Sequence, residues 1–164
     1  ERSFAIADEK GMNHVAALAL LLKSQITKAK SDEQANELLA SAERLANDVN
    51  DADLIYRCLA LKGEWLLEVG NWEKALAELT KANELLSKWR SDWRNAGHDD
   101  TWLEDPLRFK TVLMLAQCIV RKEGVTAADK FVDEIGWLPL KEEWVQKAAS
   151  LQTLEPKQKR SKRS

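Results

Sequence analysis

Apolar residues recur every three or four positions along most of this chain, and no segment shows the alternation of apolar and polar residues typical of a half-buried strand. The clearest stretch is 32–49, whose apolar positions follow one face of a helix. Residues 1–10 give little periodic signal. We therefore expect an all-α protein of antiparallel hairpins. The seven predicted helices cover 12–30, 32–49, 52–69, 72–96, 106–122, 127–135 and 140–151.

Two of these helices carry distinctive patterns. The helix over 52–69 is apolar on most sides, which predicts a central position. Gly63 lies inside it at a cost of about 1 kcal/mol relative to Ala, so we expect another helix to approach closely there. The stripe of the helix over 12–30 expected to face the core consists of Val15, Leu18, Leu22 and Ile26.

Local signals mark several helix starts. Ser31 is a predicted N-cap, with Gln34 completing a capping box. Asp105 precedes Pro106, a proline suited to the first helical position. Thr126 is expected to cap the short helix over 127–135.

Composition supports the helical class. Among 164 residues, Leu and Ala number 45 whereas Val, Ile and Thr number 19, and β-branched residues lose side-chain freedom in helices. The low counts of 6 Gly and 3 Pro leave few breaks between helices. With 45% hydrophobic and 32% charged residues, the chain is neither a collagen, nor wholly disordered, nor a disulfide scaffold.

The net charge of −2 combines an acidic body with a basic end. Without the five cations of the last eight residues, 20 basic residues face 27 acidic ones, so residues 1–156 carry about −7. An acidic body disfavours a broad nucleic-acid-binding face. Residues 152–164 are expected to form a disordered tail, or alternatively an arm for phosphate binding or nuclear import, through Lys157, Lys159, Arg160, Lys162 and Arg163.

Cys58 and Cys118 lie within apolar helical patterns, so we expect reduced core cysteines, with a bridge or a reactive thiol as the alternative. The longest apolar run, residues 15–22, is too short to cross a bilayer and does not resemble a signal peptide. We expect an intracellular, cytoplasmic protein, or a nuclear one if the tail is an import signal. The chain opens on Glu1, so we expect a fragment or processed product of a longer protein.

Three predicted helix pairs, over about 12–49, 52–96 and 106–135, share an internal pattern. Their second helices repeat apolar residues at a spacing of four and then three. The three sets are Ala35, Leu39, Ala42; Ala75, Leu79, Ala82; and Ala128, Val132, Ile135.

This pattern resembles the tetratricopeptide repeat, in which a small residue marks the crossing of two helices and an aromatic residue follows the turn. Gly63 and Trp72 match these places in the second pair. The crossing position is Ala116 in the third pair and Lys23 in the first. The resemblance implies hairpins stacked as a right-handed superhelix over residues 1–151, with the helix over 140–151 as a cap.

In tetratricopeptide proteins the first helices of the pairs line a concave groove that holds a partner. A clamp for a C-terminal carboxylate in some members falls here on Leu20, Ser24, Leu61 and Met114, and only Lys110 fits it. The resemblance therefore implies an amphipathic partner helix or peptide instead. The implied groove contains Leu20, Leu21, Ser24, Lys28, Arg57, Leu61, Glu64, Glu68, Lys110, Met114, Gln117 and Arg121.

A second candidate surface lies at the end of the long fourth helix. It comprises Trp89, Arg90, Trp93, Arg94 and, after the loop, Trp102. Trp and Arg are favoured interface anchors, so this group is a candidate binding patch. The alternative is packing of the long helix against the loop and the fifth helix. Three further tryptophans, Trp65, Trp72 and Trp144, are expected in the core.

Catalytic constellations do not occur in the sequence. There are two histidines, and neither a nucleophile elbow nor a glycine-rich phosphate loop. His98, Asp99 and Asp100 are adjacent residues that rarely present convergent metal ligands, so a solvated turn is expected. We expect no enzyme activity, no cofactor and no metal.

Three hypotheses follow. The first is a non-catalytic interaction or scaffold module for a protein partner. The second is a regulatory or sensory segment of a multidomain ATPase or kinase, similar to the helical domain of MalT-like signal-transduction ATPases. The third is nucleic-acid contact through the basic tail and the patch around Arg90 and Arg94.

Overall fold

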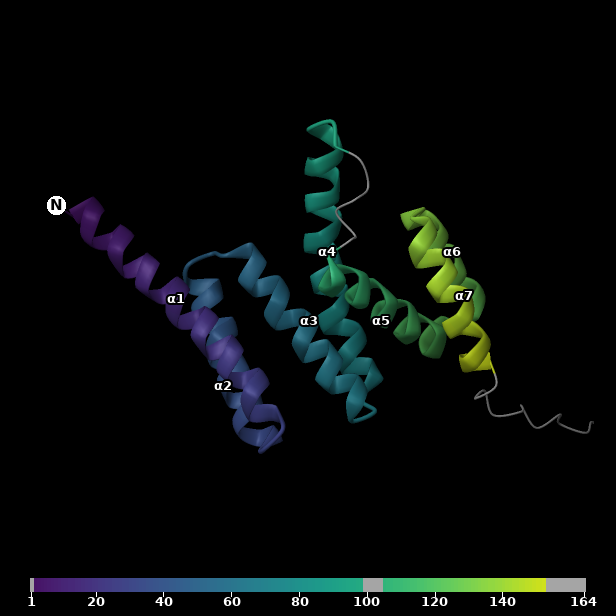
Figure 1. The fold of residues 1–164 in the computed structure, drawn as a ribbon, viewed down its shortest axis with the longest axis horizontal. Coiled ribbons are helices and arrows are strands. Elements are labelled where there is room, and N and C mark those ends of the chain that lie inside the picture. The colour runs from purple at the N-terminus through teal and green to yellow at the C-terminus, as the bar shows by residue number, and fades with distance from the viewer. Residues whose placement is uncertain (1, 99–104, 153–164) are drawn as a thin grey trace, which may run out of the picture.

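The computed structural model describes residues 2–98 and 105–152, with side chains described from residue 11 onward. This part of the chain is helical and contains no strand (Figure 1), which confirms the all-α class. The helices are α1 (Arg2–Lys28), α2 (Asp32–Asp48), α3 (Ala52–Glu68), α4 (Trp72–Asn95), α5 (Pro106–Glu123), α6 (Val125–Ile135) and α7 (Leu138–Gln152).

Each helix packs against the next one along the chain, and α1, α3, α5 and α7 also contact one another in that order. Within the described residues the backbones of α2 and α4 do not come close, and neither do those of α4 and α6, which meet through side chains. The hairpin of α1 and α2 lies at one side of the molecule, and α6 and α7 lie at the other (Figure 1). The backbones of the odd-numbered helices therefore form a continuous row, while those of the even-numbered helices stay apart.

Polar side chains begin four of the helices. Ser31, Asp51 and Asn71 each accept a hydrogen bond from the backbone N–H three residues later, and Asp105 accepts hydrogen bonds from the two backbone N–H groups of residues 107 and 108 at the start of α5. Caps of this kind contribute about 1 kcal/mol each to helix stability. The Asp51 carboxylate also lies 2.7 Å from Nδ1 of His14, which links α1 to the turn before α3.

Three helix starts differ from the sequence prediction. α1 begins at Arg2, well before residue 12, because periodicity detects burial rather than helix formation itself. α7 begins at Leu138 rather than at residue 140. The prediction that Thr126 caps α6 is wrong: Gly124 ends α5 at a φ of 92° and α6 follows at once without a side-chain cap.

The repeated apolar residues of the second helices form much of the core. The sets in α2 and α4 and the first two members of the set in α6 are each exposed by 2% or less. Trp65 and Trp144 are buried as predicted, whereas Trp72 is half-buried. Both cysteines are buried and unbridged.

Small residues allow the helices of each pair to approach. A Cβ atom on Gly63 would lie 2.6 Å from Cγ and Cδ2 of Leu79, which confirms the predicted close approach of α3 and α4. Ala116 is fully buried in α5. In α1, however, the buried small residue is Ser24 and not Lys23, which is exposed. In the first hairpin, the segment between the crossing residue and the repeated apolar set of the second helix is one residue shorter than in the other two hairpins. An alignment based on the second helices alone does not show this difference.

The side of α1 that faces the core also differs from the prediction. α1 has two apolar faces, and α2 packs against the one that holds Ala17, Leu21 and Ser24, all of them buried. Periodicity locates apolar faces but does not say which of them a neighbour covers. The stripe expected in the core is exposed: Val15 by 64%, Leu18 by 37%, Leu22 by 52% and Ile26 by 72%.

We expect Gly63→Ala to lower the free energy of unfolding by about 1–2 kcal/mol. A new methyl group against Leu79 costs about 1–3 kcal/mol, partly offset by the better helix propensity of Ala. Gly11→Ala is the matched control, because a Cβ there meets nothing within 4 Å, and it should raise stability by up to about 1 kcal/mol. Urea unfolding followed by circular dichroism measures both. Equal effects of the two substitutions would contradict a tight crossing.

Candidate functional site

Two surfaces hold the residues singled out from the sequence. The first, here called the odd-helix face, follows the row formed by α1, α3 and α5. Its accessible or half-buried members are Lys28, Arg57, Glu64, Glu68, Lys110, Gln117 and Arg121. The second is a pocket between α3, α4 and α5, described below.

Ion pairs connect the helices of the odd-helix face. Nζ of Lys28 lies 3.6 Å from Oε2 of Glu68 and 5.0 Å from the centre of the Trp65 ring, which joins α1 to α3. Nζ of Lys110 donates a hydrogen bond to Glu64 and joins α5 to α3. Residues that the resemblance assigns to a partner-binding groove thus form ion pairs with one another, and these pairs connect neighbouring helices.

Several predicted groove residues are not accessible. Ser24, Leu61 and Met114 are buried, as is Leu21, and Leu20 is half-buried. The Ser24 hydroxyl donates a hydrogen bond to the carbonyl oxygen of Leu21, 2.6 Å away, within α1. These residues hold the helices together, and a partner on this face meets mainly the charged side chains around them.

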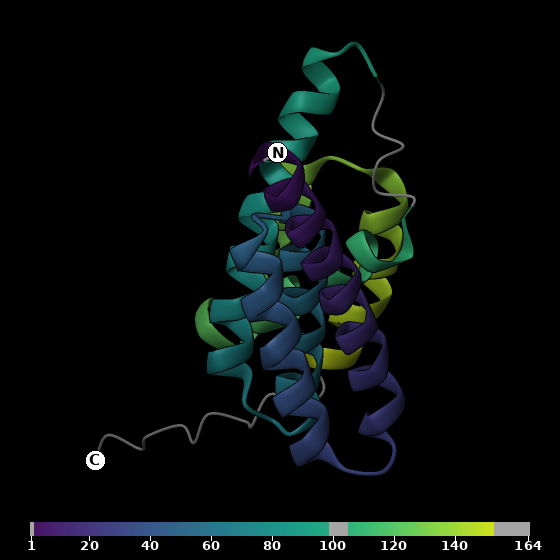
Figure 2. The ribbon, with the colours of Figure 1, turned by 90° about the vertical axis from the view of Figure 1, so that its left-hand side faces the viewer.

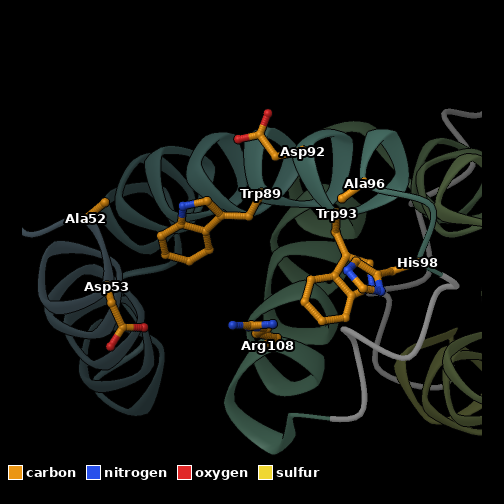
Figure 3. A pocket seen from close by; sticks show the side chains of 8 residues that line it. All are labelled: Ala52, Asp53, Trp89, Asp92, Trp93, Ala96, His98 and Arg108. Carbon is orange, nitrogen blue, oxygen red and sulfur yellow. The ribbon is translucent and has the colours of Figure 1, made fainter.

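The pocket opens where the C-terminal half of α4 passes the first turns of α3 and α5, and its volume is about 550 Å³. In Figure 3, Trp89 and Trp93 point from α4 toward Arg108 of α5, while Asp92 points the other way. The residues that line the pocket are Ala52, Asp53, Trp89, Asp92, Trp93, Ala96, His98 and Arg108.

Trp89 is the inner wall of this pocket. Its ring meets the edge of Tyr56 at 5.5 Å between ring centres, and the Arg108 guanidinium lies 5.8 Å from its centre on another side. Behind it, the Tyr56 hydroxyl lies 2.9 Å from Oγ1 of Thr111, and that hydroxyl in turn donates to the carbonyl of Leu107. Tyr56 therefore donates to Thr111, and the aromatic wall is fixed from α3 and α5 together.

Trp93 is the outer wall and is 41% exposed. The His98 ring packs on it at 4.2 Å between ring centres, at an angle of 33°. At the opposite edge, Asp53 accepts a hydrogen bond from Nε of Arg57 at 2.7 Å, and this bond raises the pKa of Arg57. The pocket thus combines two indole faces with an ion pair at its rim.

Arg90 and Arg94 of the predicted patch are not among the residues that line the pocket. Arg90 donates a hydrogen bond to the carbonyl of Ile135 and ties α4 to the end of α6. Arg94 is exposed beyond the pocket lining, and Trp102 lies outside the described residues. The packing alternative weighed from the sequence thus describes Trp89, which lies against Tyr56 and Arg108, whereas binding through this patch stays a prediction.

Sequence reasoning missed Asp53 and Arg108 as pocket residues. Trp89 and Trp93 were found because they are four apart on one helix, but Asp53 and Arg108 belong to other helices and have no local signal. Only the order in which α3, α4 and α5 pack brings these side chains together.

Among the described residues, neither a metal-binding cluster nor an activated thiol occurs. No three His, Cys, Asp or Glu side chains converge there on a possible metal position, and Asp99 and Asp100 lie outside the described ranges. Burial raises the pKa of the Cys58 thiol to about 12 and that of Cys118 to about 11, so neither is a ready nucleophile. No helix in these ranges is long and apolar enough to cross a membrane.

Comparison with known proteins adds no identification. No protein-family model, no curated protein and no solved structure matches the chain. Its function is therefore argued from its own residues.

Burial raises the pKa of Tyr56 to about 12 from its usual 10, and Tyr56 is the only tyrosine in the chain. We expect tyrosinate absorbance at alkaline pH to appear near pH 12 in the folded protein and near pH 10 in denaturant. The folded state favours the neutral phenol, so this contribution is present below pH 10 and lost as the pH rises through 12. The loss is about 2–3 kcal/mol. Ionisation near pH 10 without unfolding would contradict the buried Tyr56–Thr111 bond.

Proposed function

We propose that this chain is a non-catalytic interaction module, a tetratricopeptide-like right-handed superhelix of three hairpins with α7 as its cap. The sequential packing of the helices, the row of odd-numbered helices and the small residue at each crossing support this architecture. Such repeats expose an extended surface that suits a protein partner.

The observation that carries the proposal is the pocket beside Trp93. A partly exposed tryptophan next to a second indole and an arginine has the composition of an interface anchor site. Two indole rings and two alanines supply most of the apolar lining of the pocket, so binding of a partner side chain is the activity it supports best.

The pocket continues into the odd-helix face through α3. Asp53, Arg57, Glu64 and Glu68 follow one another at helical spacing, so they share one side of this helix. Asp53 lines the pocket and Arg57 is bonded to it. A partner segment lying along the odd-helix face thus reaches the pocket at the N-terminal end of α3.

The chemistry of the partner follows from the charge of the body. Residues 1–156 carry about −7, and Asp53 and Asp92 lie at the pocket. We propose a partner segment with an aromatic or aliphatic anchor for the Trp89–Trp93 pocket, flanked by basic residues. Charge of this kind mainly increases the association rate, while the anchor supplies affinity.

Selection of a phage-displayed library of random linear peptides on the immobilised full chain tests the proposal. We expect enriched peptides to contain a large apolar residue beside Lys or Arg. Trp93→Ala should weaken the binding of a labelled selected peptide about tenfold or more, measured by fluorescence anisotropy. Arg57→Glu with Lys110→Glu should change the affinity as well.

Val69→Ala is the matched control, because Val69 is 66% exposed at the far end of α3 and should leave the affinity unchanged. Selected peptides that bind the Trp93 and Arg57/Lys110 variants as tightly as the wild type would overturn the assignment of this surface. Failure of any peptide to enrich would count against a peptide-binding module.

A further inference from the structure

The outer side of α1 is an apolar surface that no described element covers. Between residues 12 and 29, the only charged side chain at an exposed position is that of Lys23. Figure 2 views this end of the molecule, with α1 and α2 in front. The large apolar side chains concerned are Met12 (63% exposed), Val15 (64%), Leu18 (37%), Leu22 (52%) and Ile26 (72%).

The exposed apolar residues of α1 occupy the positions at which α3 and α5 pack against the preceding helices. Each of α1, α3 and α5 carries a set of four residues at successive spacings of four, three and four positions. The last residue of each set lies two positions after the small residue at which that helix crosses its partner. In α3 this set is buried in one cluster with residues of α1 and α2, and in α5 its last two members are buried with residues of α4. The sets are Val15, Ala19, Leu22, Ile26; Leu54, Cys58, Leu61, Trp65; and Leu107, Thr111, Met114, Cys118.

The other end of the molecule is different. The corresponding outer side of α7 combines Glu142, Glu143 and Gln146 at exposed positions with the exposed apolar side chains of Leu138 and Val145. A helical array needs polar residues on the outer faces of its ends to remain soluble, and α7 has two exposed acidic residues there while α1 has only Lys23 at the edge of its apolar surface. Head-to-tail association would place the charged side of α7 against the apolar side of α1, which disfavours it.

The N-terminal part of α1 bears on whether a further hairpin, joined as α3 is joined to α2, could cover the apolar surface of α1. Met12 is the counterpart of Asp51, the cap that follows the short turn between α2 and α3. α1 instead continues as helix back to Arg2. A hairpin of this chain therefore cannot be attached there by the turn used between α2 and α3.

We propose that the outer face of α1 binds the same face of a second copy, forming a two-fold symmetric homodimer. Met12, Val15, Ala19, Leu22 and Ile26 alternate three and four apart, the spacing of a coiled-coil seam. In an antiparallel pair Ala19 lies at the axis, where a small residue permits close approach. Val15 then lies opposite Leu22 of the second copy, and Met12 opposite Ile26.

Charge and composition favour this occupant. Lys23 lies at the edge of the seam and, in the antiparallel register, near Val15 and Ala16 of the second copy, so no like charges meet. Interfaces between identical subunits are more apolar than those of transient complexes, and a face with a single charge fits the former. Two-fold contact closes the assembly and leaves no apolar stripe open.

Light scattering coupled to size exclusion tests the proposal on the full chain. We expect a dimer of twice the 18.6 kDa chain mass for the wild type, and a monomer for Ile26→Glu. Val145→Glu is the matched control, since Val145 is 67% exposed on α7, and it should remain dimeric. Circular dichroism should show unchanged helix content in both variants. A wild type that stays monomeric at every concentration measured, or dimers that survive Ile26→Glu, would overturn the proposal.

Cross-linking tests the register independently of dimer stability. Ala19→Cys should form a covalent dimer with a short bismaleimide, whereas Ala149→Cys, an exposed position on α7, should not. The native thiols at Cys58 and Cys118 are buried and contribute little background. Equal yields at the two positions would contradict pairing through α1.

Discussion

The close approach of paired helices at a small residue is the constraint on which the rest of the structure depends. Gly63 lets α3 lie against Leu79 of α4, and Ser24 and Ala116 occupy the same place in the neighbouring pairs. Consecutive odd-numbered helices also come into contact. That contact allows Tyr56 of α3 to reach Thr111 of α5, and the aromatic pocket is built on this bond.

The parts of the fold that the sequence predicts are those in which one helix carries its own information. The Ala-Leu-Ala sets and Gly63 report burial and close packing locally, and their positions agree with the structure. Ile26 and its stripe were misplaced because α1 is apolar on two sides, and choosing between them requires knowing the neighbour. Asp53 and Arg108 were missed for the same reason, since only tertiary packing brings them to Trp89.

The charged and aromatic surfaces have different energetic roles. Exposed ion pairs such as Lys110–Glu64 are worth about 0–1 kcal/mol each, so a partner exchanges them for its own charges at little cost. By contrast, the exposed indole surface of Trp93 contributes binding free energy only when a partner covers it. In the proposed function, the odd-helix face orients the partner and the pocket retains it.

The order of contacts between helices has a consequence for folding. Almost every contact joins helices that are adjacent in the chain or separated by one helix. The Lys62 side chain of α3 lies within 3.5 Å of acidic oxygens on both α2 and α4, so it is among the few groups that connect these two helices. Chains with such local contacts fold quickly and resemble a one-dimensional array in which each unit depends only on its neighbours. Opening of α6 and α7 therefore need not propagate to α1 and α2, and the protein is expected to unfold from its ends while the Gly63 crossing persists longest.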